Sequence, residues 1–304
     1  MQPFKVHILG CGSALPTERH KPSSQVVEIR GKLFMIDCGE GTQLQIRRSR
    51  LSFTKIYAVF ISHLHGDHVL GLVGMLSTFG LNGRTAPLHV YAPAEYEALL
   101  NLEVKMFCNN LDYEIVFHGV DTKESRVVYE DRSLSVETIP LKHRVGCCGY
   151  LFREKEGQRH IKRDMIDFYG VPVSQINNIK AGLDWVSPEG EIIKNELLTS
   201  PSDPARSYAY CSDTRYMPEL ADAVKDVTLL YHEATYAEDN HEMAVKYLHS
   251  TAKEAAMTAK DANAGKLMIG HFSKRYPSED VLHKEAMEVF PDTILAREGL
   301  VVEV

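Results

Sequence analysis

Three histidines and one aspartate lie within six positions of residues 61–71, at His63, His65, Asp67 and His68. An apolar run directly precedes them, so these side chains stand where a strand is expected to turn into a helix. Neighbouring imidazoles and a carboxylate gain nothing from proximity unless a cation offsets the cost of removing them from water. The cluster therefore indicates a metal site rather than a set of helix caps.

The spacing within the cluster divides its ligands between two ions. Residues two apart in an extended chain point the same way, so His63 and His65 would bind one ion. A turn at Gly66 would redirect Asp67 and His68 toward a second ion. Because a catalytic zinc ion has three protein ligands and an open position, each ion needs at least one more ligand from elsewhere.

Ligand-type residues also follow four other expected strands, at Asp37, His143, Asp213 and His271. Taken singly, the aspartates could cap helices and the histidines could be hydrogen-bonded core residues. Layered α/β folds, however, gather their functional groups where strands give way to loops. We therefore expect His143 and His271 to complete the two ligand sets, and Asp213 to bridge the two ions.

The elements that must position these residues alternate between β-rich and helical segments. Strands are expected at both ends of the chain, which predicts mixed sheets covered by helices, an α/β layered fold. Residues 155–204 break the alternation because they are polar and rich in glycine and proline. We expect an inserted arm there, within a single domain that spans residues 1–304. The expected helices cover residues 41–48, 94–107, 164–169, 218–225, 252–262 and 279–289.

Composition limits the remaining classes of function. A chain of 304 residues with 44% hydrophobic content can bury a sizeable core, and its net charge of −7 gives no sign of a polyanion partner outside local basic patches. No stretch approaches the roughly 20 apolar residues that span a bilayer, and the first residues lack a secretion signal, so we expect a cytoplasmic protein. The six cysteines are expected to be reduced, and the pair Cys147 and Cys148 to be core residues rather than a redox or soft-metal feature.

Several longer motifs carry a resemblance to a known family. The motif SHLHGDH at Ser62 resembles the metal motif of the metallo-β-lactamase superfamily. The fuller set, spread over nearly the whole chain, resembles the ribonuclease Z family of tRNA 3′-processing endonucleases. That set is LGCGSALP at Leu9, DCGEGTQ at Asp37, LKHRVGCCGY at Leu141, SDTR at Ser212, HEAT at His232, HST at His249 and GHFSKRY at Gly270.

The resemblance implies an αββα sandwich of two mixed sheets with two Zn²⁺ ions per subunit at one edge. It also implies a homodimer and an inserted arm that grips the tRNA precursor. The arm departs from the family in one respect, because no Gly-Pro run follows the GVP of residues 170–172. The implied ligands are His63, His65, His143 and Asp213 for one zinc, and Asp67, His68, His271 and the bridging Asp213 for the other.

Other residues around the metals are expected to act in the reaction. Asp67 would act as the base toward the attacking water, and His249 as the acid that protonates the leaving 3′ oxygen. Glu233, which resembles the family residue for that task, would raise the pKa of His249, with a helix-capping pair as the alternative for these two residues. We expect Asp37 to orient a ligand imidazole rather than to bind metal, with capping of the next helix as the alternative.

The expected reaction is removal of the 3′ trailer from tRNA precursors by a metal-bridging hydroxide, which leaves a 3′-hydroxyl on the tRNA. Ser273 and Arg275 are expected to contact the scissile or a flanking phosphate. One alternative keeps the metals but makes the substrate a small phosphodiester, sulfate ester or lactone. Another is a non-catalytic tRNA-binding module, and the open metal positions argue against it because structural zinc sites are closed.

Overall fold

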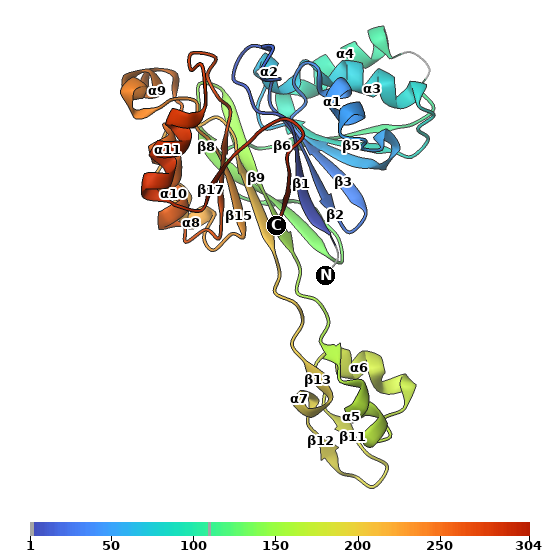
Figure 1. Cartoon of the computed structure of the whole chain (residues 1–304). Helices are drawn as coiled ribbons and strands as arrows, with labels where there is room; N and C mark the ends of the chain where they lie inside the picture. Colours follow the sequence, from blue (N-terminus) through green and yellow to red (C-terminus); the bar gives the residue numbers. More distant parts are fainter. Residues whose placement is uncertain (1–2, 109–110) are drawn as a thin grey trace.

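Two seven-stranded sheets pack face to face, with helices on their outer faces and an arm that projects from one end (Figure 1). The structure is a computed structural model, and it describes residues 3–108 and 111–304. Each sheet mixes parallel and antiparallel pairs. The expected α/β sandwich of two mixed sheets is thereby confirmed.

The first sheet has the strand order β18-β1-β2-β3-β4-β5-β6. Strands β3 to β6 run parallel to one another, whereas β1 is antiparallel to both of its neighbours. Strands β3 and β4 are almost entirely buried because residues pack on both of their faces. The strands are β1 (Phe4–Gly10), β2 (Ser24–Ile29), β3 (Lys32–Ile36), β4 (Ile56–Phe60), β5 (Leu88–Pro93), β6 (Ile115–Val120) and β18 (Val301–Glu303).

The second sheet has the order β17-β16-β15-β14-β9-β8-β7. Its half from β14 to β17 is parallel and buried, whereas β8 alternates between buried and partly exposed residues beside the edge strand β7. The strands are β7 (Val127–Glu130), β8 (Leu134–Lys142), β9 (Gly146–Glu154), β14 (Ser207–Cys211), β15 (Leu229–Glu233), β16 (Leu267–Gly270) and β17 (Thr293–Leu295).

The helices cover the outer faces of both sheets (Figure 1). One set packs on the first sheet through a cluster of buried side chains that includes Ile46, Phe79 and Leu100. The other set packs on the second sheet through small residues such as Ala255 and Ala259 of α10. The first set is α1 (Thr42–Arg48), α2 (Gly66–Val69), α3 (Leu72–Leu81) and α4 (Glu97–Phe107); the second is α8 (Leu220–Ala223), α9 (His241–Tyr247), α10 (Ala252–Asp261) and α11 (Asp280–Val289). In the described residues, 3₁₀ turns lie at Phe53–Lys55, Ala94–Tyr96, Val173–Gln175 and Glu238–Asn240.

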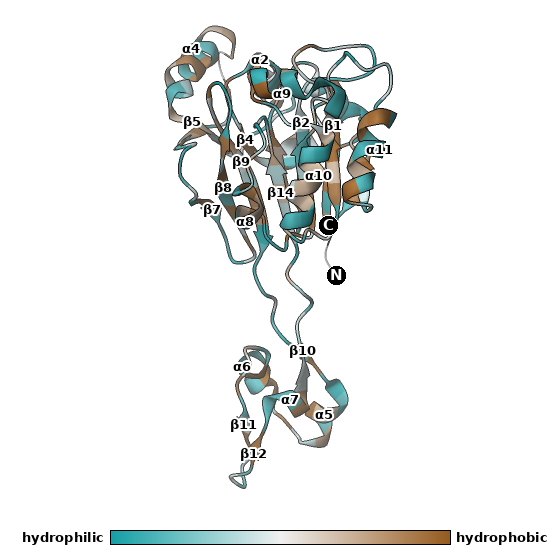
Figure 2. Ribbon diagram, turned by 90° about the vertical axis from the view of Figure 1, so that its left-hand side faces the viewer, coloured by the Kyte–Doolittle hydropathy of each residue, from teal (hydrophilic) through white to brown (hydrophobic). Residues whose placement is uncertain are grey.

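The segment between the end of β9 and the start of β14 forms the arm, which leaves the sandwich at the end opposite α2 (Figure 1). It has a small apolar core of its own, around Ile166, Ile179, Trp185 and Leu198. Figure 2 shows this mixture of hydrophobic and hydrophilic segments below a thin stalk of irregular chain. Its elements are β10 (His160–Ile161), α5 (Arg163–Phe168), α6 (Ile176–Lys180), β11 (Trp185–Val186), β12 (Ile192–Ile193), α7 (Asn195–Leu198) and β13 (Thr199–Ser200).

Most expected helices differ from the observed ones only at their ends. The expected helix 218–225 is shorter, because Val224 leaves the helical conformation and Asp226 adopts a φ of 55° before β15. The expected helix 94–107 begins with a 3₁₀ turn after Pro93. Helix α3 was not expected, since its sequence LVGMLSTFGL is apolar on nearly every side and shows no amphipathic pattern.

No helix in the described residues is long and apolar enough to cross a bilayer. All six cysteines are buried and none is in a disulfide, and Cys147 and Cys148 lie inside β9 as core residues.

The stalk suggests that the sandwich folds without the arm. The N–H of Glu154 donates to the carbonyl of Arg206 at 2.9 Å. The chain ends next to β9 and β14 are therefore hydrogen-bonded to each other where the stalk begins. Replacing residues 158–202 with a short Gly-Ser linker should keep one cooperative thermal transition by circular dichroism. Its midpoint should shift by no more than about 4 °C, which corresponds to roughly 1 kcal/mol in a domain of this size.

The matched control is Phe152→Ala, which opens a cavity between the sheets and should cost about 3–5 kcal/mol. A shortened chain that loses cooperative unfolding would show that the arm is part of the folding unit.

Candidate metal centre

Five strand ends bring the expected ligand residues to one edge of the sandwich. Asp37 follows β3, and the cluster that begins at His63 follows β4 of the same sheet. From the second sheet, His143 follows β8, Asp213 follows β14 and His271 follows β16. Side chains that are far apart in the sequence therefore meet in one place; His63 and His271, for example, are 208 positions apart.

One group of four ligand atoms consists of His63 Nε2, His65 Nδ1, His143 Nε2 and Asp213 Oδ2, all within 4.8 Å of one another. His65 Nδ1 lies 3.1 Å from His63 Nε2 and 3.2 Å from His143 Nε2. Asp213 Oδ2 lies 3.7 Å from His63 Nε2 and 3.8 Å from His143 Nε2. These separations fit the ligand shell of an ion bound at about 2.0–2.2 Å from each atom.

A second group shares the same aspartate through its other oxygen. Asp213 Oδ1 lies 3.4 Å from His68 Nε2 and 3.3 Å from His271 Nε2. Asp67 Oδ2 lies 3.6 Å from His68 Nε2 and 3.5 Å from His271 Nε2. The structure thus brings all seven expected ligands together, in the two sets that the family resemblance implied.

Three buried atoms of this centre indicate a site that could hold cations. His68 Nε2, His271 Nε2 and Asp213 Oδ1 have no hydrogen-bond partner, although each is shielded from water. A buried polar atom without a partner costs on the order of 1–3 kcal/mol, and all three of these atoms face the same point. The nitrogen and oxygen donors suit a divalent ion such as zinc.

Asp37 lies behind the ligands rather than among them. Its Oδ2 is 2.7 Å from His68 Nδ1 and accepts from the hydroxyl of Tyr210 at 2.7 Å. Its Oδ1 accepts from the N–H of Ser62 at 2.8 Å. Because Asp37 accepts the Nδ1 proton of His68, Nε2 of that ring is left to face the ion, as a ligand histidine requires.

Glu233 connects two histidines on the opposite side of the centre. Its Oε1 is 2.8 Å from His249 Nδ1, while its Oε2 accepts from the hydroxyl of Thr235 at 2.7 Å. Thr235 Oγ1 in turn lies 2.8 Å from His271 Nδ1. Burial favours the neutral form of His249, but the carboxylates of Glu233 and Asp213 outweigh burial and raise the pKa of His249 to about 9. Thr235 was not singled out from the sequence, although it stands in the HEAT motif.

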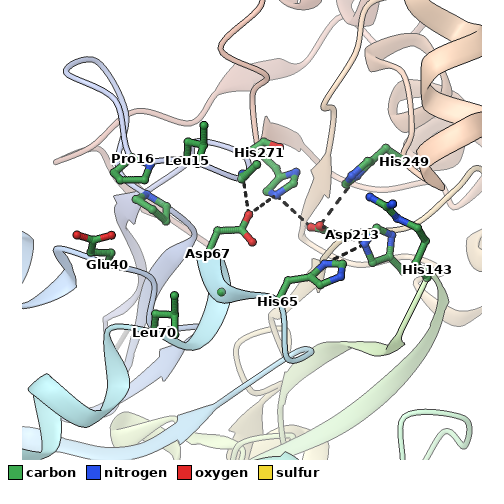
Figure 3. A pocket seen from close by; sticks show the side chains of 15 residues that line it. Leu15, Pro16, Glu40, His65, Asp67, Leu70, His143, Asp213, His249 and His271 are labelled. Atoms are coloured by element: carbon green, nitrogen blue, oxygen red, sulfur yellow. Dashed lines mark hydrogen bonds and ion pairs between the residues drawn. The ribbon is translucent and has the colours of Figure 1, made fainter.

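The cavity above the metal centre is open on one side. Figure 3 shows His65, His143, Asp213, His249 and His271 converging, with Leu15, Pro16, Glu40 and Leu70 on the other side of Asp67. The N–H of Ala14, in the loop after β1, donates to Asp67 Oδ2 at 2.7 Å. An extended polar chain could therefore enter between the loop and the metal ligands.

The residues expected to bind phosphate do not line this cavity. Arg275 packs over the ring of Tyr236 at 5.9 Å, and its Nη1 donates to Asn240 Oδ1. Ser273 is also absent from the lining, so contact of either residue with phosphate stays a prediction. Arg144, which follows the ligand His143 directly in the chain, does line the cavity and was overlooked in the sequence.

Curated proteins that are similar to this chain share its full length. It is 57% identical over 302 residues to a ribonuclease Z of Bacteroides fragilis, with 99% of each chain covered. It is 48% identical over 303 residues to a ribonuclease Z of Porphyromonas gingivalis, with 100% of each covered.

Solved structures support the fold. Human tRNase Z, short form, matches with a TM-score of 0.70 at 22% identity and covers 98% of both chains. The metallo-β-lactamase fold protein YhfI of Bacillus subtilis matches with a TM-score of 0.68 at 19% identity, covering 99% of this chain and 100% of that one.

A family model described as anti-Pycsar protein Apyc1 matches residues 4–157. That match contains His63 to His68 and His143 but ends before Asp213 and His271. It therefore covers the first half of the metal centre, whereas the full-length relatives cover both halves.

The contacts of Asp37 predict that it controls metal affinity. Asp37→Asn removes the carboxylate that holds His68 Nδ1–H, so zinc binding to the set containing His68 should weaken about 10–100-fold. A competition titration with a chromophoric chelator measures this. Asp131→Asn, whose carboxylate binds Lys32 away from the centre, is the control and should leave affinity unchanged. Equal affinity in both variants and the parent would contradict the role given to Asp37.

Proposed function

Because the chain belongs to the ribonuclease Z family, we propose that it removes the 3′ trailer from tRNA precursors with two zinc ions and leaves a 3′-hydroxyl on the tRNA. It is a metal-dependent endoribonuclease of the ribonuclease Z type. The observation that carries the proposal is the pair of ligand groups that share Asp213, beside an open cavity. We propose that the protein acts in the cytoplasm, where it would encounter tRNA precursors.

The ligands suit a reaction at a phosphodiester. The seven ligand side chains would hold the metal, which when bound would supply an activated water and stabilise the charge on the attacking and leaving oxygens. Asp67 presents Oδ2 to His68 and His271, and its other oxygen is available to orient the attacking water and accept its proton. The N–H of Ala14 holds Asp67 in that orientation.

His249 is the proposed acid for the leaving 3′ oxygen. Its ring lies next to both ligand sets, with its centroid 4.9 Å from that of His143 and 5.4 Å from that of His271. Glu233 accepts the Nδ1 proton, so Nε2 is the nitrogen that can donate to substrate. Glu233 is fully buried, and it keeps this imidazole charged and fixed in orientation.

Arg144 is the cation best placed to meet a phosphate in the cavity. It follows His143 in the chain, and its guanidinium packs over the ring of Tyr247 at 5.1 Å. A guanidinium donates two parallel hydrogen bonds to phosphate oxygens, which would fix the strand relative to the ions. Ser273 and Arg275 would act further along the substrate.

The arm favours a folded RNA substrate over a small ester, because a small ester needs no contact far from the metal centre. Charge on the arm is unevenly spread: residues 155–204 contain six lysines and arginines against eight aspartates and glutamates. The basic groups Arg159, His160, Lys162, Arg163 and Lys180 lie in its first half, whereas most acidic groups follow Gly182. We therefore assign tRNA contact to the first half of the arm, β10 to α6.

A homodimer follows from the same proposal. The arm leaves the sandwich at the end opposite α2, which follows the metal ligands, so it points away from the centre of its own chain (Figure 1). In a dimer, the arm of one protomer can hold the tRNA that its partner cleaves. Two exposed leucines on the helices of the first sheet, Leu44 and Leu81, offer apolar side chains for self-association.

The direct test compares two substrates. A tRNA precursor with a 3′ trailer should be cut to a tRNA with a 3′-hydroxyl, and a chelator should abolish the cut until zinc is restored. Bis(p-nitrophenyl) phosphate tests the small-ester alternative. Chelator-sensitive turnover of that ester with no cleavage of the tRNA would reject the proposed substrate.

His249→Ala should lower kcat for tRNA cleavage about 10²–10⁴-fold, because proton transfer to the leaving oxygen is lost. Metal content, measured by mass spectrometry, should remain at the parent value, since His249 completes neither of the two expected ligand sets. The control is His241→Ala, an exposed histidine of α9, which should leave kcat unchanged. Loss of metal together with activity would contradict the acid role.

Complementation tests the arm and the dimer together. One chain lacks residues 158–202 and keeps the metal ligands; the other keeps the arm and carries His65→Ala. Each alone should process tRNA poorly, and mixed dimers isolated by two tags should regain activity. Mixed dimers that form but stay inactive would show that each arm serves its own centre.

A further inference from the structure

A second group of metal-binding side chains lies outside the catalytic centre. Cys11 follows β1, His20 lies in the loop before β2, and Glu298 lies between β17 and β18. Their atoms Cys11 Sγ, His20 Nδ1 and the Glu298 carboxylate oxygen lie within 4.8 Å of one another. We propose that these three side chains bind a third divalent ion of the zinc class.

The distances fit one small ion. Cys11 Sγ is 3.4 Å from His20 Nδ1, and His20 Nδ1 is 3.1 Å from Glu298 Oε2. Ligand atoms of a tetrahedral zinc ion, bound at about 2.0–2.3 Å, lie roughly 3.3–3.7 Å from one another. The carbonyl oxygen of Ala296 is 3.5 Å from Cys11 Sγ, and as a fourth donor to the proposed ion it would close the site.

The surrounding contacts hold each ligand in the orientation that a metal requires. The other ring nitrogen of His20, Nε2, lies 3.0 Å from Glu279 Oε1. The carboxylate therefore accepts a hydrogen bond from Nε2–H, and Nδ1 faces the thiol of Cys11. Arg19 in turn pairs with Glu279 at 3.2 Å. The N–H of Lys21 donates to Glu298 Oε1 at 2.7 Å, which leaves Oε2 for the ion.

The cluster concentrates acidic groups around one imidazole. Two carboxylates, Glu298 at Nδ1 and Glu279 at Nε2, flank His20 next to a fully buried thiol. Burial, followed by the charge of Glu298, raises the pKa of Cys11 well above its usual value. A divalent cation reverses this because it binds the thiolate and offsets the acidic charge. The thiolate and imidazole favour zinc over magnesium or calcium, which prefer oxygen ligands.

The ion would stabilise one side of the catalytic cavity without contacting substrate. It would connect the chain after β1, the loop before β2 and the segment before β18. The carbonyl of Cys11 accepts from the N–H of Phe272, which follows the ligand His271, at 2.8 Å. The same loop carries Ala14, whose N–H holds Asp67. The third site is therefore structural and closed, in contrast to the open catalytic pair.

Cobalt substitution tests the site with a signal that the catalytic pair does not give. The expected catalytic ligands include no cysteine, so a thiolate-to-cobalt charge-transfer band in the near ultraviolet reports a cysteine-bound ion alone. The full-length chain loaded with Co²⁺ should show this band. In Cys11→Ser the band should vanish and the metal content should fall by one ion per chain.

Two further variants complete the design. Cys108→Ser is the matched control, a buried thiol bound to the carbonyl of Val73, and it should keep the band. Glu279→Gln should weaken occupancy about 10–100-fold while the site remains formed. A folded, cobalt-loaded parent without the band would overturn the proposal, even if Cys11→Ser cannot be purified. A band that survives both Cys11→Ser and His20→Ala would also overturn it.

Discussion

A single buried carboxylate, Asp213, determines how this edge of the molecule is built. It faces His63 and His143 through one oxygen and His68 and His271 through the other, at 3.3–3.8 Å. Burial of these polar groups is unfavourable unless cations occupy the space between them. The two sheets therefore meet where their strand ends can surround bound metal, and the other functional groups are arranged around that site.

Backbone strain accompanies this arrangement. Asp37 and His271 have φ values of 56° and 61°, in the left-handed region that residues with side chains rarely adopt. Each such residue costs about 1–3 kcal/mol and persists only where neighbouring contacts hold it. Ser62 and Tyr210 hold the side chain of Asp37, and Thr235 holds the imidazole of His271. The hydrogen bonds behind the ligands thus stabilise both the metal geometry and the strained chain.

Sequence predicted the parts of the centre that depend on strand ends, because His143, Asp213 and His271 each follow an apolar run that forms a buried strand. It could not show which arginine lies nearest the centre, since nothing in the pattern indicates that Arg144 lines the cavity while Arg275 packs over Tyr236. In the arm, α6 and α7 were missed because helices of five and four residues carry no measurable periodicity. Their positions come from the arm's small core rather than from local sequence.

The central claim is that two ions share Asp213, and anomalous X-ray scattering from crystals of the zinc-loaded chain tests it most directly. Data collected on both sides of the zinc absorption edge should show two peaks about 3.5–4 Å apart, one beside each oxygen of Asp213. A single peak bound by His63, His65 and His143, with none between His68 and His271, would contradict the account.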